Sequence, residues 1–338
     1  MSRLFVWALA AAGLLSVSGL LLGIPNLRAA QDVARSHARL TAENAGWDAV
    51  VNGIVSAFDE ADVVALAATR GRMGSDLRIR LVRQPDFPKR VRSIIVEWGN
   101  SIYQPVLDRY IDGDDVPATE LQRLWRDQTQ VASWDSAIHA NFFAAVREVN
   151  RSLPRDKRLR VLGGDSPIDW SKVNTNADYM RFAGADRRDE SLASVLSNQV
   201  LKKREKALVI YGGAHFKAVK DSAPGRVFVV YTMGGSSASF PDFERALLSR
   251  ERPILVSLKG TRAAAFAANL FPWGARRFVQ GKEVPLFAPT VTLGDLADAC
   301  VYYGQGPEAD AYVDPEPDPG IYEGTPYGAE VARRKRLR

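Results

Sequence analysis

The sequence predicts an α/β fold: a mainly parallel central sheet with helices on both faces and a site at the carboxyl ends of the strands. Short β-rich runs alternate with helical patterns from about residue 40 onward, which is typical of strand–helix–strand units. Most of the runs are continuously apolar, as expected for strands that helices cover on both sides. Several of them also end on a glycine, a carboxylate or a histidine, where an open parallel sheet binds its ligands.

Six runs are the expected strands. In chain order they are "DVVALAA" (62–68), "SIIVEWG" (93–99), "LRVLGGD" (159–165), "ALVIYGG" (207–213), "RVFVVYT" (226–232) and "PILVSLKG" (253–260). Between them we expect a helix with Ser75 as its N-cap, a helix over 135–153 with an apolar stripe, and a helix over 188–204 that begins acidic and ends basic.

The composition indicates a globular chain with a nearly neutral body. Of its 338 residues 46% are hydrophobic, which is enough for a substantial core. The formal net charge is +6, and five positive charges lie in the last six residues, 333–338. The body therefore has no nucleic-acid-binding surface. The basic tail is expected to be a solvated helix end, and contact with anionic lipid or a partner is the alternative.

Cys300 is the only cysteine of the chain. A single cysteine excludes an intramolecular disulfide and a cysteine-rich metal site. Its surroundings, "LADACVYY", predict a buried helical face, so Cys300 is expected to be an inert core thiol.

The first residues predict export. Residues 4–23 are uncharged and follow one arginine, which is the outline of a secretory signal. The apolar run is also close to the ~20 residues that span a bilayer, so a retained inner-membrane anchor competes with cleavage. We therefore expect a signal peptide or anchor over 1–30, a periplasmic or secreted α/β domain over 40–303, and a Pro/Gly-rich arm with a basic helix over 304–338.

The residues that end the strands form the candidate site. Glu97 and Trp98 end the second run, Asp165 ends the third, and His215 follows two glycines after the fourth. Two carboxylates and an imidazole should therefore meet at one edge of the sheet. The glycines let the backbone turn sharply, or let a ligand approach, just before the histidine.

Each candidate also has a purely structural explanation. Glu97 lies in an apolar run, where a buried carboxylate is costly unless it is paired, so an ion pair with Arg78 or Arg80 is the alternative to a site role. The alternative for His215 is a structural hydrogen bond, and for Asp165 it is a turn cap. The other histidines, which are expected to be incidental, are His37 and His139, the latter on the polar phase of its helix.

These stretches resemble the erythromycin-esterase-like branch of a bacterial superfamily that also includes haem-uptake ChaN-like lipoproteins and the TraB/Tiki proteins. The similar segments include "IIVEWGNS", "LRVLGGDSPIDWS" and "ALVIYGGAHF", within about residues 45–235. The superfamily has a "GExH" ending its first strand, a glutamate ending the next strand, and a late "GxxH". Glu97 matches the second element, and Gly212 with His215 matches the third. The resemblance is to exported members of the group.

The first element of that pattern is missing from this chain. Where the family reads "VVALGExHG", residues 63–71 read "VVALAATRG". Ala67 stands in place of the glycine, Ala68 in place of the glutamate, and Arg70 in place of the histidine that the resemblance makes the general base. A methyl group carries no proton, and a guanidinium stays protonated and offers no lone pair. Two catalytic groups are therefore lost, and a fixed positive charge is gained.

Two functions remain open. The first is a degenerate, non-catalytic binder whose arginines hold an anionic small molecule against aromatic walls, and the ChaN resemblance makes haem one candidate. The second is a hydrolase of an ester, lactone or amide, with His215 as general base, Glu97 orienting it or a water, and Arg70 binding an oxyanion. A metal site is the weakest option, because no two ligands are closely spaced. The expected catalytic residues are Glu97, His215 and Asp165, and the expected ligand-binding residues are Arg70, Arg78, Arg80, Trp98, Asp169 and Trp170.

Overall fold

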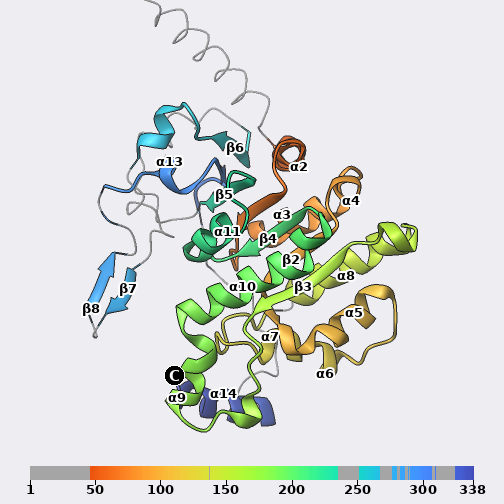
Figure 1. Cartoon of the computed structure of the whole chain (residues 1–338), viewed down its shortest axis with the longest axis vertical. Coiled ribbons are helices and arrows are strands. Elements are labelled where there is room, and N and C mark those ends of the chain that lie inside the picture. The colour runs from red at the N-terminus through yellow and green to blue at the C-terminus, as the bar shows by residue number, and fades with distance from the viewer. Residues whose placement is uncertain are drawn as a thin grey trace, which may run out of the picture.

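The computed structural model describes residues 46–136, 138–234, 251–266, 276–279, 282–285, 288, 290–306, 309 and 324–338. The strands of its main sheet are β1 (Val63–Ala67), β2 (Ser93–Asn100), β3 (Arg160–Asp165), β4 (Ala207–Tyr211), β5 (Val227–Met233), β6 (Ile254–Ser257) and β9 (Ala299–Tyr302). They form a seven-stranded sheet in the order β3-β2-β4-β1-β5-β9-β6 (Figure 1). All neighbours in this sheet are parallel except β6 and β9. The predicted α/β fold is confirmed.

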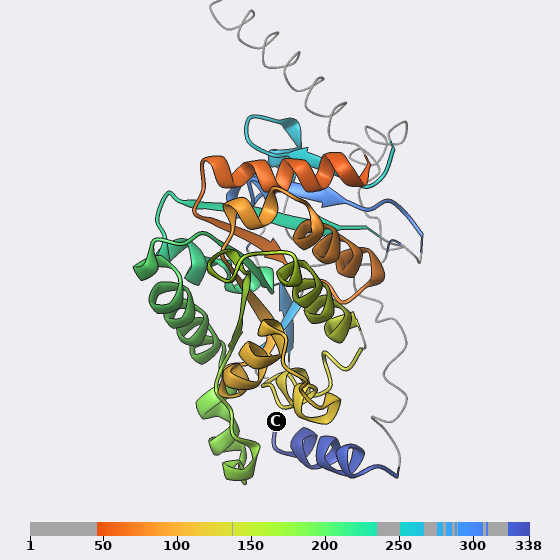
Figure 2. The same ribbon diagram turned by 90° about the vertical axis from the view of Figure 1, so that its right-hand side faces the viewer.

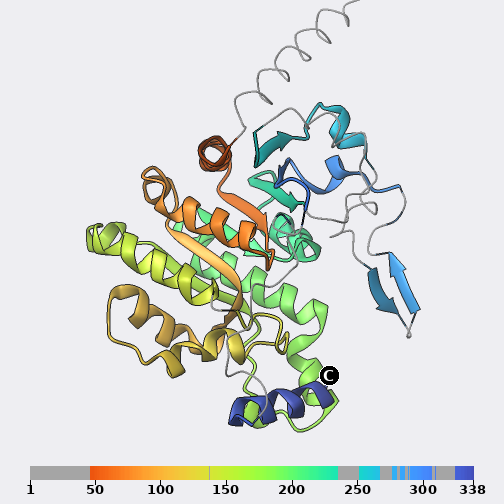
Figure 3. The same ribbon diagram turned by 180° about the vertical axis from the view of Figure 1, so that it is seen from behind.

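Helices cover both faces of the sheet, as Figure 2 and Figure 3 show. One core lies beneath α2 (Trp47–Ser56), α3 (Arg72–Arg83), α5 (Gln104–Asp112) and α8 (Ile138–Arg151), and the other beneath α10 (Ala185–Gln199), α11 (Phe216–Ser222) and α13 (Leu293–Leu296). Successive strand residues enter opposite cores: Ile95 packs toward α10 and Val96 toward α3. This alternation also decides which face each site residue of β2 reaches.

The remaining elements lie outside the two main helix layers. Besides 3₁₀ turns, they are the helices α4 (Phe87–Arg90), α6 (Ala118–Leu121), α7 (Arg123–Arg126), α9 (Asn176–Ala183) and α14 (Pro326–Arg336), and a separate antiparallel pair, β7 (Arg276–Val279) with β8 (Lys282–Pro285). No helix of the described residues is long and apolar enough to cross a bilayer. The segment 4–23, on which the export prediction depends, lies outside those residues, as does most of the expected C-terminal arm.

The helix expected to start with Ser75 as its N-cap begins earlier. Gly71 is the last extended residue, with φ −70° and ψ 165°, and the helix starts at Arg72. Ser75 is therefore an interior residue of α3, buried at 5% exposure, and caps nothing. The other two expected helices are α8 and α10, with shifted ends.

The segment around Cys300 is a strand, and the predicted helical face is wrong. Cys300 pairs with Tyr231 of β5 on one side and with Val256 of β6 on the other. A short apolar run fits either a buried strand or a buried helix, and pairing with two neighbouring strands is a long-range effect that periodicity does not reveal. Cys300 is buried, as expected for a core thiol, and burial raises the pKa of the thiol to about 12.

The basic C-terminal helix α14 packs onto the domain, and a wholly solvated helix end is a wrong expectation. Arg334 is 5% exposed, and its Nη2 donates to Asp127 Oδ1 over 2.7 Å. Its guanidinium carbon lies 4.7 Å from the ring centre of Trp170. The arginine is buried because Asp127 supplies the opposite charge that a buried guanidinium needs.

Candidate functional site

The carboxyl ends of β2 and β3 and the turn after β4 bring the three predicted catalytic residues together around one arginine. Arg188 of α10 donates from Nη2 to Glu97 Oε1 over 2.6 Å and from Nε to Asp165 Oδ1 over 3.0 Å. Its Nη1 lies 3.0 Å from Nε2 of His215. Arg188 is 8% exposed, so this is a nearly closed, charged network at the predicted edge of the sheet.

Glu97 is held as a carboxylate by charge and hydrogen bonds. Its Oε2 accepts from the backbone N–H of Gly212 over 2.7 Å, and Oε1 accepts from the side-chain amide of Gln130 as well as from Arg188. Burial would raise the pKa of Glu97, but the charge and hydrogen bonds of Arg188 outweigh burial and hold the pKa below its usual range. Both oxygens are engaged, so Glu97 has little capacity to orient an additional water.

Asp165 is engaged in the same way. Its Oδ2 accepts from the backbone N–H of Thr129 over 2.6 Å, and its Oδ1 accepts from the Thr129 hydroxyl over 2.9 Å and from Arg188. The side chain is fully buried. Asp165 therefore fixes the loop that contains Thr129 against the end of β3, which is a structural role.

His215 is fixed in one tautomer by its two partners. Arg188 has only donors, so Nε2 accepts its hydrogen bond and the ring hydrogen lies on Nδ1. Nδ1 lies 2.6 Å from Oδ1 of Asp189, the neighbour of Arg188 on α10. An aspartate behind a histidine is the arrangement that orients a general base, but here Arg188 occupies the lone pair that would accept a proton.

Gly213 is required where it stands because the turn after β4 lies close to β5. A Cβ at Gly213 would lie 2.4–2.5 Å from ring atoms of Tyr231, whose hydroxyl donates to Gly213 O over 2.9 Å. At Gly212 a Cβ would lie 3.4 Å from the Glu97 carboxylate oxygens, at the limit of ordinary contact. The close approach at Gly213 sets the position of the 3₁₀ turn Gly213–His215 and so of the imidazole.

Four residues of the network were not predicted from the sequence: Arg188, Asp189, Thr129 and Gln130. Arg188 and Asp189 lie within a helix whose charged beginning reads as an ordinary solvated first turn. Thr129 and Gln130 lie in a loop without a periodic pattern. The one sequence feature that could have indicated this network was the buried charge of Glu97, because a buried carboxylate requires a cationic partner. That partner is Arg188 of α10, 91 residues away along the chain.

The end of β1, where the family-like motif is lost, lies beside the network. Ala67 pairs with Tyr211, and the N–H of Ala68 donates to Tyr211 O over 2.9 Å. Ala68 is thus next to Gly212, which donates to Glu97. Arg70 is half-buried and lies between this strand end and the start of α3. Of the predicted ligand-binding residues, Arg70 is the one in the loop that directly follows β1.

Arg78 and Trp98 lie on the other face of the sheet. Trp98 follows Glu97 on β2 and so points to the α3 side, where it is fully buried. Arg78 of α3 lies over its ring, with 4.8 Å from the guanidinium carbon to the ring centre. The expected ion pair of Glu97 with Arg78 or Arg80 is therefore wrong, because Glu97 faces α10 and both arginines belong to α3.

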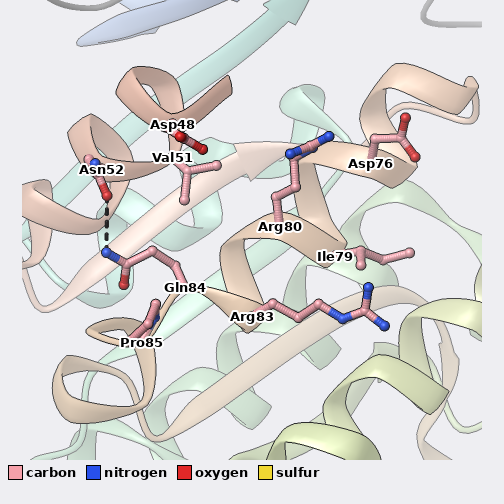
Figure 4. Close-up of a pocket in the computed structure, with 9 residues that line it drawn as sticks. All are labelled: Asp48, Val51, Asn52, Asp76, Ile79, Arg80, Arg83, Gln84 and Pro85. Atoms are coloured by element: carbon pink, nitrogen blue, oxygen red, sulfur yellow. Dashed lines mark hydrogen bonds between the residues drawn. The ribbon is translucent and has the colours of Figure 1, made fainter. Parts of the chain in front are cut away.

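Arg80 lines an open groove of about 600 Å³ between α2 and α3. Figure 4 shows Arg80 and Arg83 in it together with Asp48 and Asp76. The guanidinium carbon of Arg80 lies 4.8 Å from the ring centre of Trp47. The groove is lined by both acidic and basic side chains, so it has no preference for an anion. No residue of the Arg188 network lines the groove.

Asp169 and Trp170 have structural contacts. Asp169 accepts from the backbone and hydroxyl of Ser171. Trp170 is 5% exposed, donates from Nε1 to Asp127 O over 3.0 Å and stacks on Tyr179. Neither residue joins the Arg188 network. Because Trp170 is almost fully buried, its ring does not form an open aromatic wall for a ligand. Across the described part of the chain, no three His, Cys, Asp or Glu side chains are placed to hold a metal ion.

Comparison with known proteins supports the fold. No protein-family model matches the sequence, and no curated protein matches it.

Three solved structures are similar to this chain. A Bacillus cereus protein has a TM-score of 0.50 at 11% identity, covering 82% of this chain and 97% of that one. A histidine-to-asparagine mutant of the erythromycin esterase EreC, in its open conformation, has a TM-score of 0.52 at 11% identity, covering 78% and 94%. A succinoglycan biosynthesis protein has a TM-score of 0.52 at 8% identity, covering 81% and 97%. The fold of this chain is erythromycin-esterase-like.

Proposed function

We propose that this chain is a non-catalytic ligand-binding protein that keeps an erythromycin-esterase-like fold. The main evidence for the proposal is the contact between Arg188 and His215. Nε2 of His215, the atom whose lone pair a general base would use, accepts a hydrogen bond from Nη1 of Arg188 over 3.0 Å. The neighbouring end of β1 supplies Ala67 and Ala68, which cannot move a proton. A hydrolase needs a base with a free lone pair near its substrate, and His215, the predicted base at this edge of the sheet, has no free Nε2 lone pair while Arg188 is in place.

The ligand in this proposal is an anionic small molecule whose acidic group is held by Arg70. A guanidinium is permanently charged and matches carboxylate or phosphate geometry. Arg70 precedes the first residue of α3 by two positions, where the N–H groups of a helix start add positive potential. Haem, with its two propionates, is one candidate that the resemblance to ChaN-like proteins brings in.

Haemin titration of the purified protein tests the binding residue. We expect saturable binding that weakens about tenfold or more in Arg70→Ser, because one charge-assisted contact contributes roughly 1.5–3 kcal/mol. Arg72→Ser is the matched control, since Arg72 is an exposed arginine two residues away, and it should bind as the native protein does. Equal haemin affinity in the native protein and Arg70→Ser would contradict the assignment.

The pair of Asp189 and His215 supports hydrolysis as a second candidate function. Nδ1 of His215 lies 2.6 Å from Oδ1 of Asp189, and this hydrogen bond favours the tautomer in which Nε2 can act as the base. In this candidate an anionic substrate draws the guanidinium of Arg188 away and releases Nε2. The reaction would be hydrolysis of an ester, lactone or amide, with His215 activating the water.

Export is part of the proposal. The uncharged run 4–23 would direct the domain across the inner membrane, either as a cleaved signal or as a retained anchor. Cell fractionation with N-terminal sequencing separates the two, and an intact chain found free in the cytoplasm would contradict both.

A further inference from the structure

A second polar cluster lies on the α3 side of the sheet, on the opposite face of β2 from Glu97. Trp98 contacts Trp134 and His139, with ring centres 5.6 and 5.1 Å away, and Trp134 and His139 are 5.3 Å apart. Arg78 lies over the Trp98 ring. These four residues, the Arg78 cluster, are 0–4% exposed. His139 was expected to be incidental on a polar helix face, and it is instead fully buried among aromatic rings.

Every member of the Arg78 cluster has a polar nitrogen without a hydrogen-bond partner. They are Nε of Arg78, Nε1 of Trp98, Nε1 of Trp134, and both ring nitrogens of His139. Burial and the charge of Arg78 lower the pKa of His139 well below its usual value, so the ring is neutral and has one N–H. The Arg78 cluster therefore contains four buried N–H donors without a hydrogen-bond partner. In most proteins almost all buried donors are hydrogen-bonded.

The charge of Arg78 has no carboxylate partner within the described part of the chain. Among the described residues its side chain makes one hydrogen bond, from Nη1 to Thr69 O over 2.9 Å, and no ion pair. Burial lowers the pKa of Arg78 to about 10, which leaves the guanidinium charged at neutral pH. A buried charge without a partner is strongly unfavourable, and the contact with the face of Trp98 offsets only part of that cost.

We propose that the Arg78 cluster binds a small monovalent anion of the size of chloride. One such anion balances the charge of Arg78 and accepts from the guanidinium, indole and imidazole N–H groups. The near-complete burial of all four side chains favours a single-atom anion over a larger organic acid. The site lies on the other face of the sheet from the Arg188 network, so it is independent of the ligand-binding function proposed above.

Bromide soaked into crystals of the native protein tests the site directly, because its anomalous scattering locates the ion. We expect a peak within hydrogen-bond distance of Arg78 Nε and of at least one of the Trp98, Trp134 and His139 nitrogens. Density for water, or none, at this place in bromide-soaked crystals would overturn the proposal. The test needs no variant, so it stands even if substitutions of Arg78 do not fold.

Thermal unfolding gives the matching solution test, with chloride replaced by gluconate at constant ionic strength. The native melting temperature should rise by about 3 °C for each tenfold increase in chloride above the dissociation constant. Arg78→Met should lose this response. Arg83→Met should keep it, because Arg83 lies on the same helix with 55% of its side chain exposed. A native protein insensitive to chloride, or a response that survives in Arg78→Met, would contradict the site.

Discussion

Arg188→Met is expected to lower the free energy of unfolding by about 3–5 kcal/mol, the usual cost of removing one partner from a buried ion pair. Arg188 is 8% exposed and donates to both Glu97 and Asp165, which are 4% and 0% exposed. Methionine has a similar length and no charge, so both carboxylates would remain buried without their cation. Urea or guanidinium denaturation measures the loss.

Arg187→Met is the matched control for Arg188→Met. Arg187 is the preceding residue and pairs with Glu190 over 2.7 Å, with side chains 58% and 63% exposed. An exposed pair contributes about 0–1 kcal/mol, so this variant should unfold close to the native protein. Similar stability of the two variants would contradict the central position of Arg188.

The effect of Arg188→Met should also depend on pH. The native pKa of Glu97 is lowered, so the stability that Glu97 contributes is fully present above its unfolded pKa, about 4.3. That contribution is lost as the pH falls through the native pKa. The difference in stability between native protein and variant should therefore narrow in acid, and a difference that widened below pH 4 would oppose this assignment.

Arg334→Met is expected to cost about 3 kcal/mol, at the lower end of the range for a buried pair. Arg334 donates to Asp127 and Glu330, both over 2.7 Å, and its side chain is 6% exposed. Asp127 lies two residues before Thr129, which binds Asp165. Hydrogen exchange should therefore also become faster in the segment 127–130.

Arg336→Met is the control for Arg334→Met. Arg336 is an exposed arginine on the same helix, and removing its charge should change stability by less than about 0.5 kcal/mol. If the two variants unfolded alike and exchange at 127–130 stayed slow, α14 would not support the site.

The sequence predicts where the strands of this protein end, but it does not predict that Arg188 of α10 joins the site. Continuous apolar runs predicted the buried strands, and the rule that parallel strands end at one edge correctly placed Glu97 and Asp165 close to His215. Arg188 gave no signal of its own, because a charged residue in the first turn of a helix is usually solvated. Only the tertiary packing of α10 over β2 and β3 makes it the centre of the site.

His139 and Cys300 show the same limit. The apolar stripe of α8 placed His139 on the polar side of the helix, but Trp98 and Trp134 pack against that side too. Cys300 lies in a run too short for its period to separate helix from strand. In both cases the deciding contact comes from a segment distant in the sequence.

Whether His215 still acts as a base is measured most directly by hydrolysis of a small activated ester, such as p-nitrophenyl acetate, by the native protein and by His215→Ala. General-base catalysis typically contributes about 10²–10⁴-fold. Because Arg188 occupies Nε2 of His215, we predict the same background rate for both proteins. A native rate well above background that falls to background in His215→Ala, with the variant still folded, would contradict the non-catalytic function and establish the hydrolase.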